Sequence, residues 1–390
     1  MTVASIAIVG GGPAGLSIAA VLESKGIKDY IVYERSAPET VPRGSCLDLH
    51  AGSGQKVFKD IGASDELEEV ARRGEATVHY IVNHHMERLL QFGEGRDAPE
   101  VDRWDIRRIL LNHIPSEKVR FKTGVDRTYR DDTGKIVLEL QNGETVSGFT
   151  LVVGADGGFS KVRHLVNSAK IHYTGYTSVS TKIMASNPYY DQAISDFTKS
   201  NYAVCGLGNL IWCAPQNNGD LQMELVIQTP ETFPAGYEID LNDFEANKKF
   251  MLKDEHFGQY APEVHKAIQA SDGPWRPWRL YHMPVDCFNW PCQGDVTLIG
   301  DASHATTPWA GDGVNCSMRD ALILARTITE LGITKEAVAQ YEKEMFTWAT
   351  DLITRCIQSG DLFLEKDNPK RLVEVFSAQM DHIIGGTDDV

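Results

Sequence analysis

Three short runs of apolar residues along the chain each lead directly into a glycine. The runs are rich in β-branched residues and lack polar alternation, which is typical of strands that are covered on both faces of a parallel sheet. They are Ile6–Val9 before Gly10, Thr150–Val153 before Gly154, and Val296–Ile299 before Gly300. We therefore expect three buried parallel strands, each followed by a glycine-bearing turn.

The first run continues into a helix and a second strand. The helical pattern covers about residues 15–25 and ends at Gly26, after which the chain returns through Tyr30–Tyr33. Glycine commonly follows the last turn of a helix, because it adopts the left-handed backbone conformation without a steric penalty. This order predicts a βαβ unit, the minimal frame for binding a dinucleotide.

Later regions show other patterns. Residues 119–153 alternate between polar and apolar positions around turn signals, which predicts a small antiparallel sheet. Residues 172–282 are rich in strand formers and turns, whereas residues 335–365 carry apolar side chains at helical spacing. We expect an α/β fold with a Rossmann-like domain over residues 1–171 and 283–330, an inserted β-sheet substrate domain over 172–282, and a long C-terminal helix with a tail over 331–390.

Composition narrows the class of protein. The chain has 390 residues and a formal net charge of −16, which argues against the basic surface that binds nucleic acid. It has no basic leader and no run of about 18 apolar residues, so we expect no stable membrane association. Its seven cysteines include no Cys-x-x-Cys pair, which favours reduced thiols over disulfides or a zinc site. These features predict a cytoplasmic protein without a metal site, as a monomer or homodimer.

A glycine-rich motif follows the first predicted strand. It fits G-x-G-x-x-G at the start of the predicted helix and reads Gly10-Gly11-Gly12-Pro13-Ala14-Gly15. Its glycines let the backbone approach a pyrophosphate, whose charge is met by free amides at the helix N-terminus. Glu34, 19 residues after Gly15, can accept hydrogen bonds from a ribose diol and would repel a 2′-phosphate. The motif predicts an FAD or NAD site and leaves the choice between them open.

Two later motifs carry a resemblance to a known family. Residues 154–163 read Gly-Ala-Asp-Gly-Gly-Phe-Ser-Lys-Val-Arg. Residues 300–315 contain Gly-Asp-Ala-Ser-His, Pro308 and Gly-Asp-Gly-Val-Asn. With the first motif, they resemble the three motifs of class A FAD-dependent monooxygenases, the flavoprotein aromatic hydroxylases. The resemblance implies a GR2-type FAD-binding domain, in which Asp301 binds the ribityl chain and the amides of residues 313–315 face the flavin pyrimidine.

Two positions depart from the family pattern. Asp312 replaces the usual Gln, and Thr307 replaces the first proline of a usual pair. A carboxylate that points toward the flavin would disfavour its reduction, because the reduced ring becomes anionic. A side chain that points to solvent would have no such effect. Amides at the start of the following helix would still stabilise negative charge on the ring.

Residues 44–55 and 101–112 most closely resemble the tetracycline-inactivating flavin monooxygenases, and hence suggest antibiotic modification or secondary metabolism. This resemblance implies that Asp48 and Arg103 contact FAD, with Glu34 and Arg35 at its adenosine end. Arg107 and Arg108 are equally well interpreted as contacts or as solvated helix charges. The expected FAD contacts are Gly10, Gly12, Pro13, Ala14, Gly15, Glu34, Arg35, Asp48, Arg103, Asp156, Asp301, Pro308, Gly311, Gly313, Val314 and Asn315.

The substrate positions differ from those of the tetracycline enzymes. In place of their Gln, Arg and His, this chain has Ser180, Asn201 and Gln222. A site that loses its hydrogen-bonding partners loses affinity for the original ligand, which argues against tetracycline as the native substrate. We expect Trp212, Met223 and Leu225 to form an apolar wall of the pocket or, alternatively, part of the ordinary core. We expect the pocket floor to consist of Pro308, Trp309 and Ala310.

The resemblance implies a reaction in which NADPH or NADH, as a transient co-substrate, reduces FAD. Oxygen then forms a flavin C4a-hydroperoxide that hydroxylates or epoxidises a small aromatic, enolic or polycyclic compound. No catalytic acid or base is assigned, and His304 is interpreted as structural. Arg43 is a candidate contact of the flavin or the nicotinamide. Two alternatives remain: a flavin oxidase or dehydrogenase on the same fold, and a flavin-binding protein without catalysis.

Overall fold

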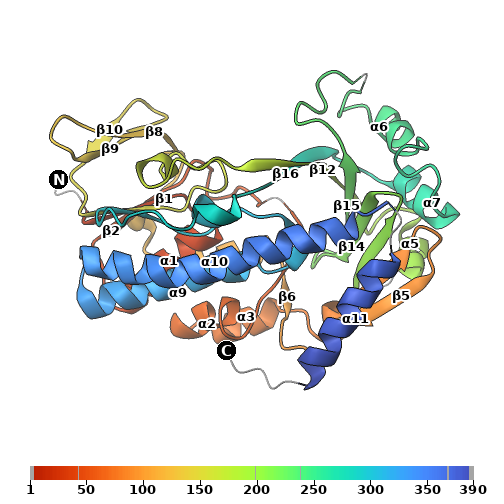
Figure 1. Ribbon diagram of the computed structural model, residues 1–390, viewed down its shortest axis with the longest axis horizontal. Helices are drawn as coiled ribbons and strands as arrows, with labels where there is room; N and C mark the ends of the chain where they lie inside the picture. The colour runs from red at the N-terminus through yellow and green to blue at the C-terminus, as the bar shows by residue number, and fades with distance from the viewer. Residues whose placement is uncertain (1–3, 43, 198, 238, 367–368, 386–390) are drawn as a thin grey trace.

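The computed structural model describes residues 4–42, 44–197, 199–237, 239–366 and 369–385. Arg43 therefore lies outside the described residues. Two main sheets stand at opposite ends of the molecule, and helix α10 (Lys335–Phe363) runs along both of them (Figure 1). The predicted α/β class is confirmed.

The first sheet is parallel and brings the three motifs together. Its strand order is β17 (Val296–Leu298), β11 (Leu151–Gly154), β1 (Ile6–Val9), β2 (Tyr30–Tyr33) and β7 (Val119–Arg120). Val9 is in register with Gly154, which is in register with Leu298. Because parallel strands end at the same edge of a sheet, the turns that follow β1, β11 and β17 lie side by side.

Several helices pack together beside this sheet. The first helix, α1, packs against α9 and α4, and α9 packs against α10. In α10, apolar residues at helical spacing such as Tyr341, Met345 and Ile353 are fully buried, and Thr334 accepts a hydrogen bond from the amide of Ala337 at its start (3.2 Å). The helices of this part are α1 (Pro13–Ser24), α2 (Gly54–Asp60), α3 (Ser64–Val70), α4 (Arg103–Asn112), α8 (Asp301–His304) and α9 (Gly313–Leu331).

The second sheet has seven strands. Their order is β16 (Arg276–His282), β12 (His172–Ile183), β15 (Leu221–Gln228), β14 (Asn209–Pro215), β13 (Asn201–Gly206), β4 (His79–Asn83) and β5 (Arg88–Phe92). The two outer strands β4 and β5 lie within residues 1–171, which we had assigned to the first domain. They join the second sheet because β4 pairs in parallel with β13, a contact that the local pattern cannot indicate.

The two faces of the seven-stranded sheet have different neighbours. One face packs its apolar side chains against α5 (Tyr190–Phe197), α6 (Phe244–Met251) and α7 (Pro262–Ala270). The other face is divided: Val226 and Leu210 pack with Phe363 and Leu372 from the C-terminal helices, whereas the adjoining polar rows remain for the site described below. Helix α11 (Lys370–Gly385) lies in the segment that we expected to contain only a tail.

Smaller elements complete the chain. The predicted antiparallel sheet consists of β8 (Val125–Arg130), β9 (Ile136–Leu140) and β10 (Thr145–Ser147). A two-stranded sheet joins β3 (Leu47–Asp48) to β6 (Glu100–Val101). Short 3-10 helices are η1 (Gly74–Thr77), η2 (Ser116–Lys118), η3 (Arg163–Leu165), η4 (Val285–Cys287) and η5 (Pro308–Ala310). None of the described helices is long and apolar enough to cross a bilayer.

Candidate active site

The first glycine loop is shaped by close packing. A Cβ on Gly10, whose φ is +109°, would overlap the carbonyl oxygen of Ala155. A Cβ on Gly15 would overlap the carbonyl oxygen of Gly10. These two glycines are therefore required by the contact between β1, α1 and the turn after β11.

Gly12 has a different environment. A Cβ at this position would meet nothing within 4 Å, so the chain leaves open space beside the loop. Gly12 is also the N-cap of α1, where no side chain accepts a hydrogen bond from the first amides. Open space in front of free helix amides is the arrangement that accommodates a pyrophosphate. The loop therefore fits the diphosphate of a dinucleotide such as FAD.

Glu34 and Arg107 brace this loop. The Glu34 carboxylate accepts hydrogen bonds from the amides of Gly11 (2.6 Å) and Ser36 (2.7 Å). Arg107, 8% exposed, donates to the carbonyl oxygen of Gly11 (3.0 Å). Its neighbour Arg108 pairs with Asp105 at the helix surface (3.1 Å). Arg107 therefore supports the glycine loop, and Arg108 is a solvated helix charge. Arg35 is exposed beside Glu34.

The second motif is joined to the third through Arg163. This buried guanidinium donates to the carbonyl oxygens of Gly158 (2.7 Å), Asp301 (2.9 Å) and Ala302 (2.7 Å). Asp156 accepts a hydrogen bond from the amide of Lys161 (2.6 Å) and so holds its own turn. The middle motif therefore orients the backbone that carries Asp301.

Asp301 itself remains accessible. Its side chain lies at the start of α8, is exposed, and makes no hydrogen bond with the described residues. The positive charges of Arg103 and Arg163 act on it. Behind it, His304 bonds to Asp320 (2.7 Å), and both side chains are fully buried. An exposed carboxylate on a rigid base is suited to bind hydroxyl groups such as those of a ribityl chain, and His304 is structural in this arrangement.

The loop after α8 is fastened to β3 by Asn315. Its side chain donates to the carbonyl oxygen of Asp48 (2.9 Å) and accepts from the amide of His50 (2.8 Å). Gly311, with φ +67°, turns the chain into α9, whose first amides have no side-chain cap. Residues 313–315 thus present a free helix N-terminus close to β3, which fits the expected flavin contact.

Asp312 is held in an ion-pair network. Its carboxylate pairs with Arg355 on α10 (3.0 Å) and lies 3.4 Å from Nδ1 of His50. His50 in turn contacts Asp48 (3.1 Å), which also pairs with Arg96 (3.2 Å). The carboxylate that replaces the usual Gln is therefore paired with the guanidinium of Arg355, so we expect no large penalty for flavin reduction from this substitution.

The predicted substrate residues share one face of the large sheet. Cross-strand register pairs Glu224 with Ser180 on one side and with Trp212 on the other, and pairs Gln222 with Ala214 in the next row. Asn201 lies on the same face, because it is two residues from Ala203, which pairs with Trp212. Met223 and Leu225 lie on the opposite face, in the core with α5–α7, so for these two residues the alternative of ordinary core packing is confirmed and the pocket wall is wrong. Trp212 pairs with Glu224 and shares its face of the sheet. Met223 and Leu225 flank Glu224 in β15, and successive side chains of a strand point to opposite faces, so both point away from Trp212.

The residues expected at the pocket floor lie beside α10. Trp309 packs so closely on this helix that a Cβ on Gly360 would lie 2.6 Å from its Cδ1. Pro308 is exposed and Ala310 is partly buried. Trp309 and Trp212 both border the apolar cluster between the sheet and the C-terminal helices.

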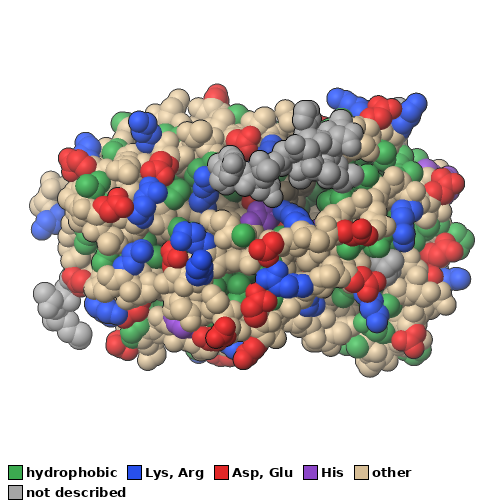
Figure 2. Space-filling model, turned by 90° about the horizontal axis from the view of Figure 1, so that it is seen from below, with side chains coloured by type: hydrophobic (Ala, Val, Ile, Leu, Met, Phe, Trp, Pro, Cys, Tyr) green, Lys and Arg blue, Asp and Glu red, His purple; other side chains and the backbone are tan. Residues whose placement is uncertain are grey.

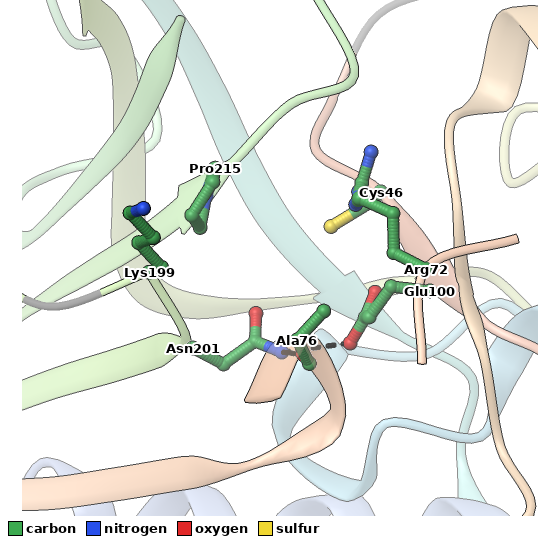
Figure 3. A pocket seen from close by; sticks show the side chains of 7 residues that line it. All are labelled: Cys46, Arg72, Ala76, Glu100, Lys199, Asn201 and Pro215. Atoms are coloured by element: carbon green, nitrogen blue, oxygen red, sulfur yellow. Dashed lines mark hydrogen bonds between the residues drawn. The ribbon is translucent and has the colours of Figure 1, made fainter. Parts of the chain in front are cut away.

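A small pocket lies between β6 and the seven-stranded sheet. Its lining comes from Cys46, Arg72, Ala76, Glu100, Lys199, Asn201 and Pro215. Figure 3 shows Glu100 and Asn201 pointing toward one another, and the Asn201 amide donates to the Glu100 carboxylate (2.7 Å). The cavity volume of about 30 Å³ has room for one or two water molecules. Asn201, only 4% exposed, is therefore engaged within the protein.

Glu100 is an unusual acid that the sequence analysis missed. Burial and the Asp48 carboxylate together raise the pKa of Glu100 to about 7, although hydrogen bonds with Cys46 and Asn201 oppose the rise. Its side chain is 5% exposed. Only the pairing of β6 with β3 and the approach of β13 create this environment, so no local pattern could have identified it.

We expect Glu100→Gln to remove a pH-dependent part of the stability. Folded Glu100 stays protonated up to about pH 7, whereas the unfolded side chain ionises near 4.5. The stabilising contribution of protonated Glu100 to the free energy of unfolding is therefore complete below pH 4.5 and is lost as the pH rises to 7. At roughly 1.36 kcal/mol per pH unit, the loss is about 3 kcal/mol. Urea unfolding at pH 4.5 and at pH 8 should therefore show that, over this range, the free energy of unfolding of Glu100→Gln rises by this amount relative to that of wild type.

The exposed Glu255→Gln is the control for the loss of one carboxylate, since its side chain is 66% exposed. If wild type and Glu100→Gln show parallel stability curves across this range, the raised pKa of Glu100 is wrong.

The site defines a flavin-dependent enzyme, and comparison with known proteins identifies its family. The model of an FAD binding domain matches residues 3–355, so the chain belongs to this family. Monooxygenase asqM of Emericella nidulans is 26% identical over 410 residues, covering 89% of this chain and 92% of that protein. FAD-dependent urate hydroxylase of Klebsiella pneumoniae is 26% identical over 369 residues, covering 92% and 90%.

A solved structure agrees with this assignment at the level of the fold. Tetracycline destructase Tet(51) superimposes with a TM-score of 0.71 at 18% identity, covering 98% of this chain and 97% of that one. The expected family resemblance and the FAD cofactor are confirmed. The protein is an FAD-dependent monooxygenase.

Proposed function

We propose that this monooxygenase uses NADPH or NADH together with O2 to hydroxylate or epoxidise a small aromatic, enolic or polycyclic compound. The observation that carries the proposal is the meeting of the three FAD motifs at one sheet edge, opposite a partly polar face of the second sheet. A pocket between a cofactor domain and a second sheet is a common place for a small-molecule site.

The bound FAD supplies the redox chemistry that activates oxygen for the substrate. The chain has the other tasks. Asp301 and the amides of residues 313–315 would hold the cofactor, and Trp212 and Trp309 would enclose an aromatic ring and exclude water. Ser180 and Gln222 contribute polar groups on the facing strands. No residue is assigned as an acid or base in the reaction.

The test begins with an absorbance spectrum of the purified protein. We expect flavin bands, and oxidation of NADPH or NADH in air that is accelerated by a phenolic, enolic or indolic compound. Tetracycline should accelerate it less, because Ser180, Asn201 and Gln222 differ from the tetracycline-binding residues. Flavin that is reduced by the compound alone, with release of hydrogen peroxide, would favour an oxidase. Bound flavin without any coenzyme oxidation would favour a non-catalytic role.

The remaining expectations concern location and partners. On the face in Figure 2, acidic and basic side chains are interspersed, and neither forms a continuous stripe among the described residues. This distribution supports the proposal of a protein without a nucleic-acid partner. The seven cysteines are free thiols, which supports the proposed cytoplasmic location. Size-exclusion chromatography would distinguish a monomer from a homodimer.

A further inference from the structure

Glu224 is a carboxylate in the middle of the sheet face that looks toward the cofactor domain. It lies in β15, between Ser180 of β12 and Trp212 of β14, and the three strands are neighbours in the large sheet (Figure 1). The positive charge of Arg103, an expected FAD contact on α4, acts on this carboxylate. Glu224 therefore stands where a substrate between sheet and flavin would touch the protein.

The direct partners of Glu224 are neutral. Its oxygens accept hydrogen bonds from the hydroxyls of Ser180 (2.6 Å) and Ser178 (2.7 Å) and from the amide of Gln222 (3.2 Å). Arg103 makes no ion pair with it in the described chain, because its Nε donates to the carbonyl oxygen of Ser45 (3.0 Å). Ser180 and Gln222, two of the predicted substrate residues, thus position Glu224, which we had not predicted.

This carboxylate can accept one more donor. Four hydrogen bonds reach its two oxygens, but two of them come from the single hydroxyl of Ser180, which lies 2.6 Å from each oxygen and shares one proton between them. The Glu224 side chain is only partly buried, so a ligand that approaches it can replace one of these two contacts. Burial raises the pKa of Glu224, while its hydrogen bonds and Arg103 oppose the rise. A donor from the substrate would complete its set of partners.

Other charged groups on this face do not compensate for Glu224. Lys182 is paired with Asp220 (2.5 Å). Burial lowers the pKa of His79 to about 4, so that its ring is neutral at pH 7. The charge of Arg103 is shared with Asp301. A carboxylate on the substrate would therefore meet an unfavourable field at this position, whereas an amine or another donor would meet a favourable one.

We infer that Glu224 is a specificity-determining residue, and that the site takes an aromatic compound that presents an amine or another hydrogen-bond donor to it, in preference to a carboxylate. The inference rests on the proposed function, because it assumes that the substrate lies between this sheet and FAD. Trp212, next to Glu224 across the strands, would lie against the aromatic ring.

The test uses the FAD-loaded protein and three phenols that differ in charge. Tyramine is a cation, 4-ethylphenol is neutral, and 4-hydroxyphenylacetate is an anion; binding is followed by the change in flavin absorbance. Wild type should bind tyramine about 10-fold or more tightly than 4-hydroxyphenylacetate, with 4-ethylphenol between them. Glu224→Gln keeps the shape of the side chain and should reduce this ratio by about 10- to 100-fold.

Glu255→Gln is the matched control, because it removes an exposed carboxylate of the same domain and should leave the ratio unchanged. FAD content and Tm of each variant show whether an effect is structural, since a merely structural role would not alter preference by ligand charge. Equal ratios in wild type and Glu224→Gln, no response to tyramine, or tighter binding of the acid would overturn the inference alone. Protein without flavin would overturn the proposed function as well.

Discussion

Replacing Gly12 by valine should abolish FAD binding while leaving the fold intact. The position has φ −79°, which any residue adopts, and a Cβ there would meet nothing within 4 Å. The valine side chain would instead occupy the space in front of the α1 amides. Loss of two or three hydrogen bonds to a charged pyrophosphate corresponds to FAD affinity at least ~100-fold weaker. The measurement is a titration of apo-protein with FAD.

The control for Gly12→Val is its own secondary structure and unfolding curve, which should match those of the wild-type apo-protein. Gly12→Ala should have a smaller effect of the same kind, because a methyl group fills less of the space. Asp301→Ala should also lower flavin content, because it removes the exposed carboxylate expected at the ribityl chain. Normal FAD affinity in Gly12→Val would contradict the position assigned to the pyrophosphate.

The second large effect is expected from Arg163→Met. The substitution keeps an apolar side chain of similar length but removes three hydrogen bonds, so the carbonyl oxygens of Gly158, Asp301 and Ala302 lose their donor. A buried acceptor that loses its donor costs about 1–3 kcal/mol, so three of them should together lower the free energy of unfolding by roughly 3 kcal/mol or more. Urea unfolding should show this loss, and flavin content should fall with it, because the backbone that carries Asp301 is no longer held.

Arg108→Met is the matched control for Arg163→Met. Arg108 pairs with Asp105 one turn away on α4, and its side chain is 41% exposed. Such surface pairs contribute at most about 1 kcal/mol. Comparable unfolding free energies for the two variants would mean that Arg163 does not join the second and third motifs in the way the contacts indicate.

Local pattern was sufficient wherever a feature depends on neighbours along the chain. The strand, glycine turn and helix from Ile6 to Ser24 follow from apolar runs and glycine positions, and α10 follows from apolar residues at helical spacing. The alternation in residues 119–153 likewise indicated the small antiparallel sheet. The interpretation failed for β4 and β5, because their sheet partner β13 lies more than a hundred residues away.

The same distinction applies to the site. The sequence by itself determined the cofactor motifs, since each consists of consecutive residues whose backbone and side chains act together, as Gly10, Gly12 and Gly15 do. Only the tertiary structure decided that Arg163 supports Asp301, that Asp312 is paired with Arg355, that Glu100 is a buried carboxylate, and that Glu224 lies on the sheet face with neutral partners. The physical reason is that charge, burial and hydrogen bonding depend on distance in space, and these partners come from strands and helices that folding alone brings together.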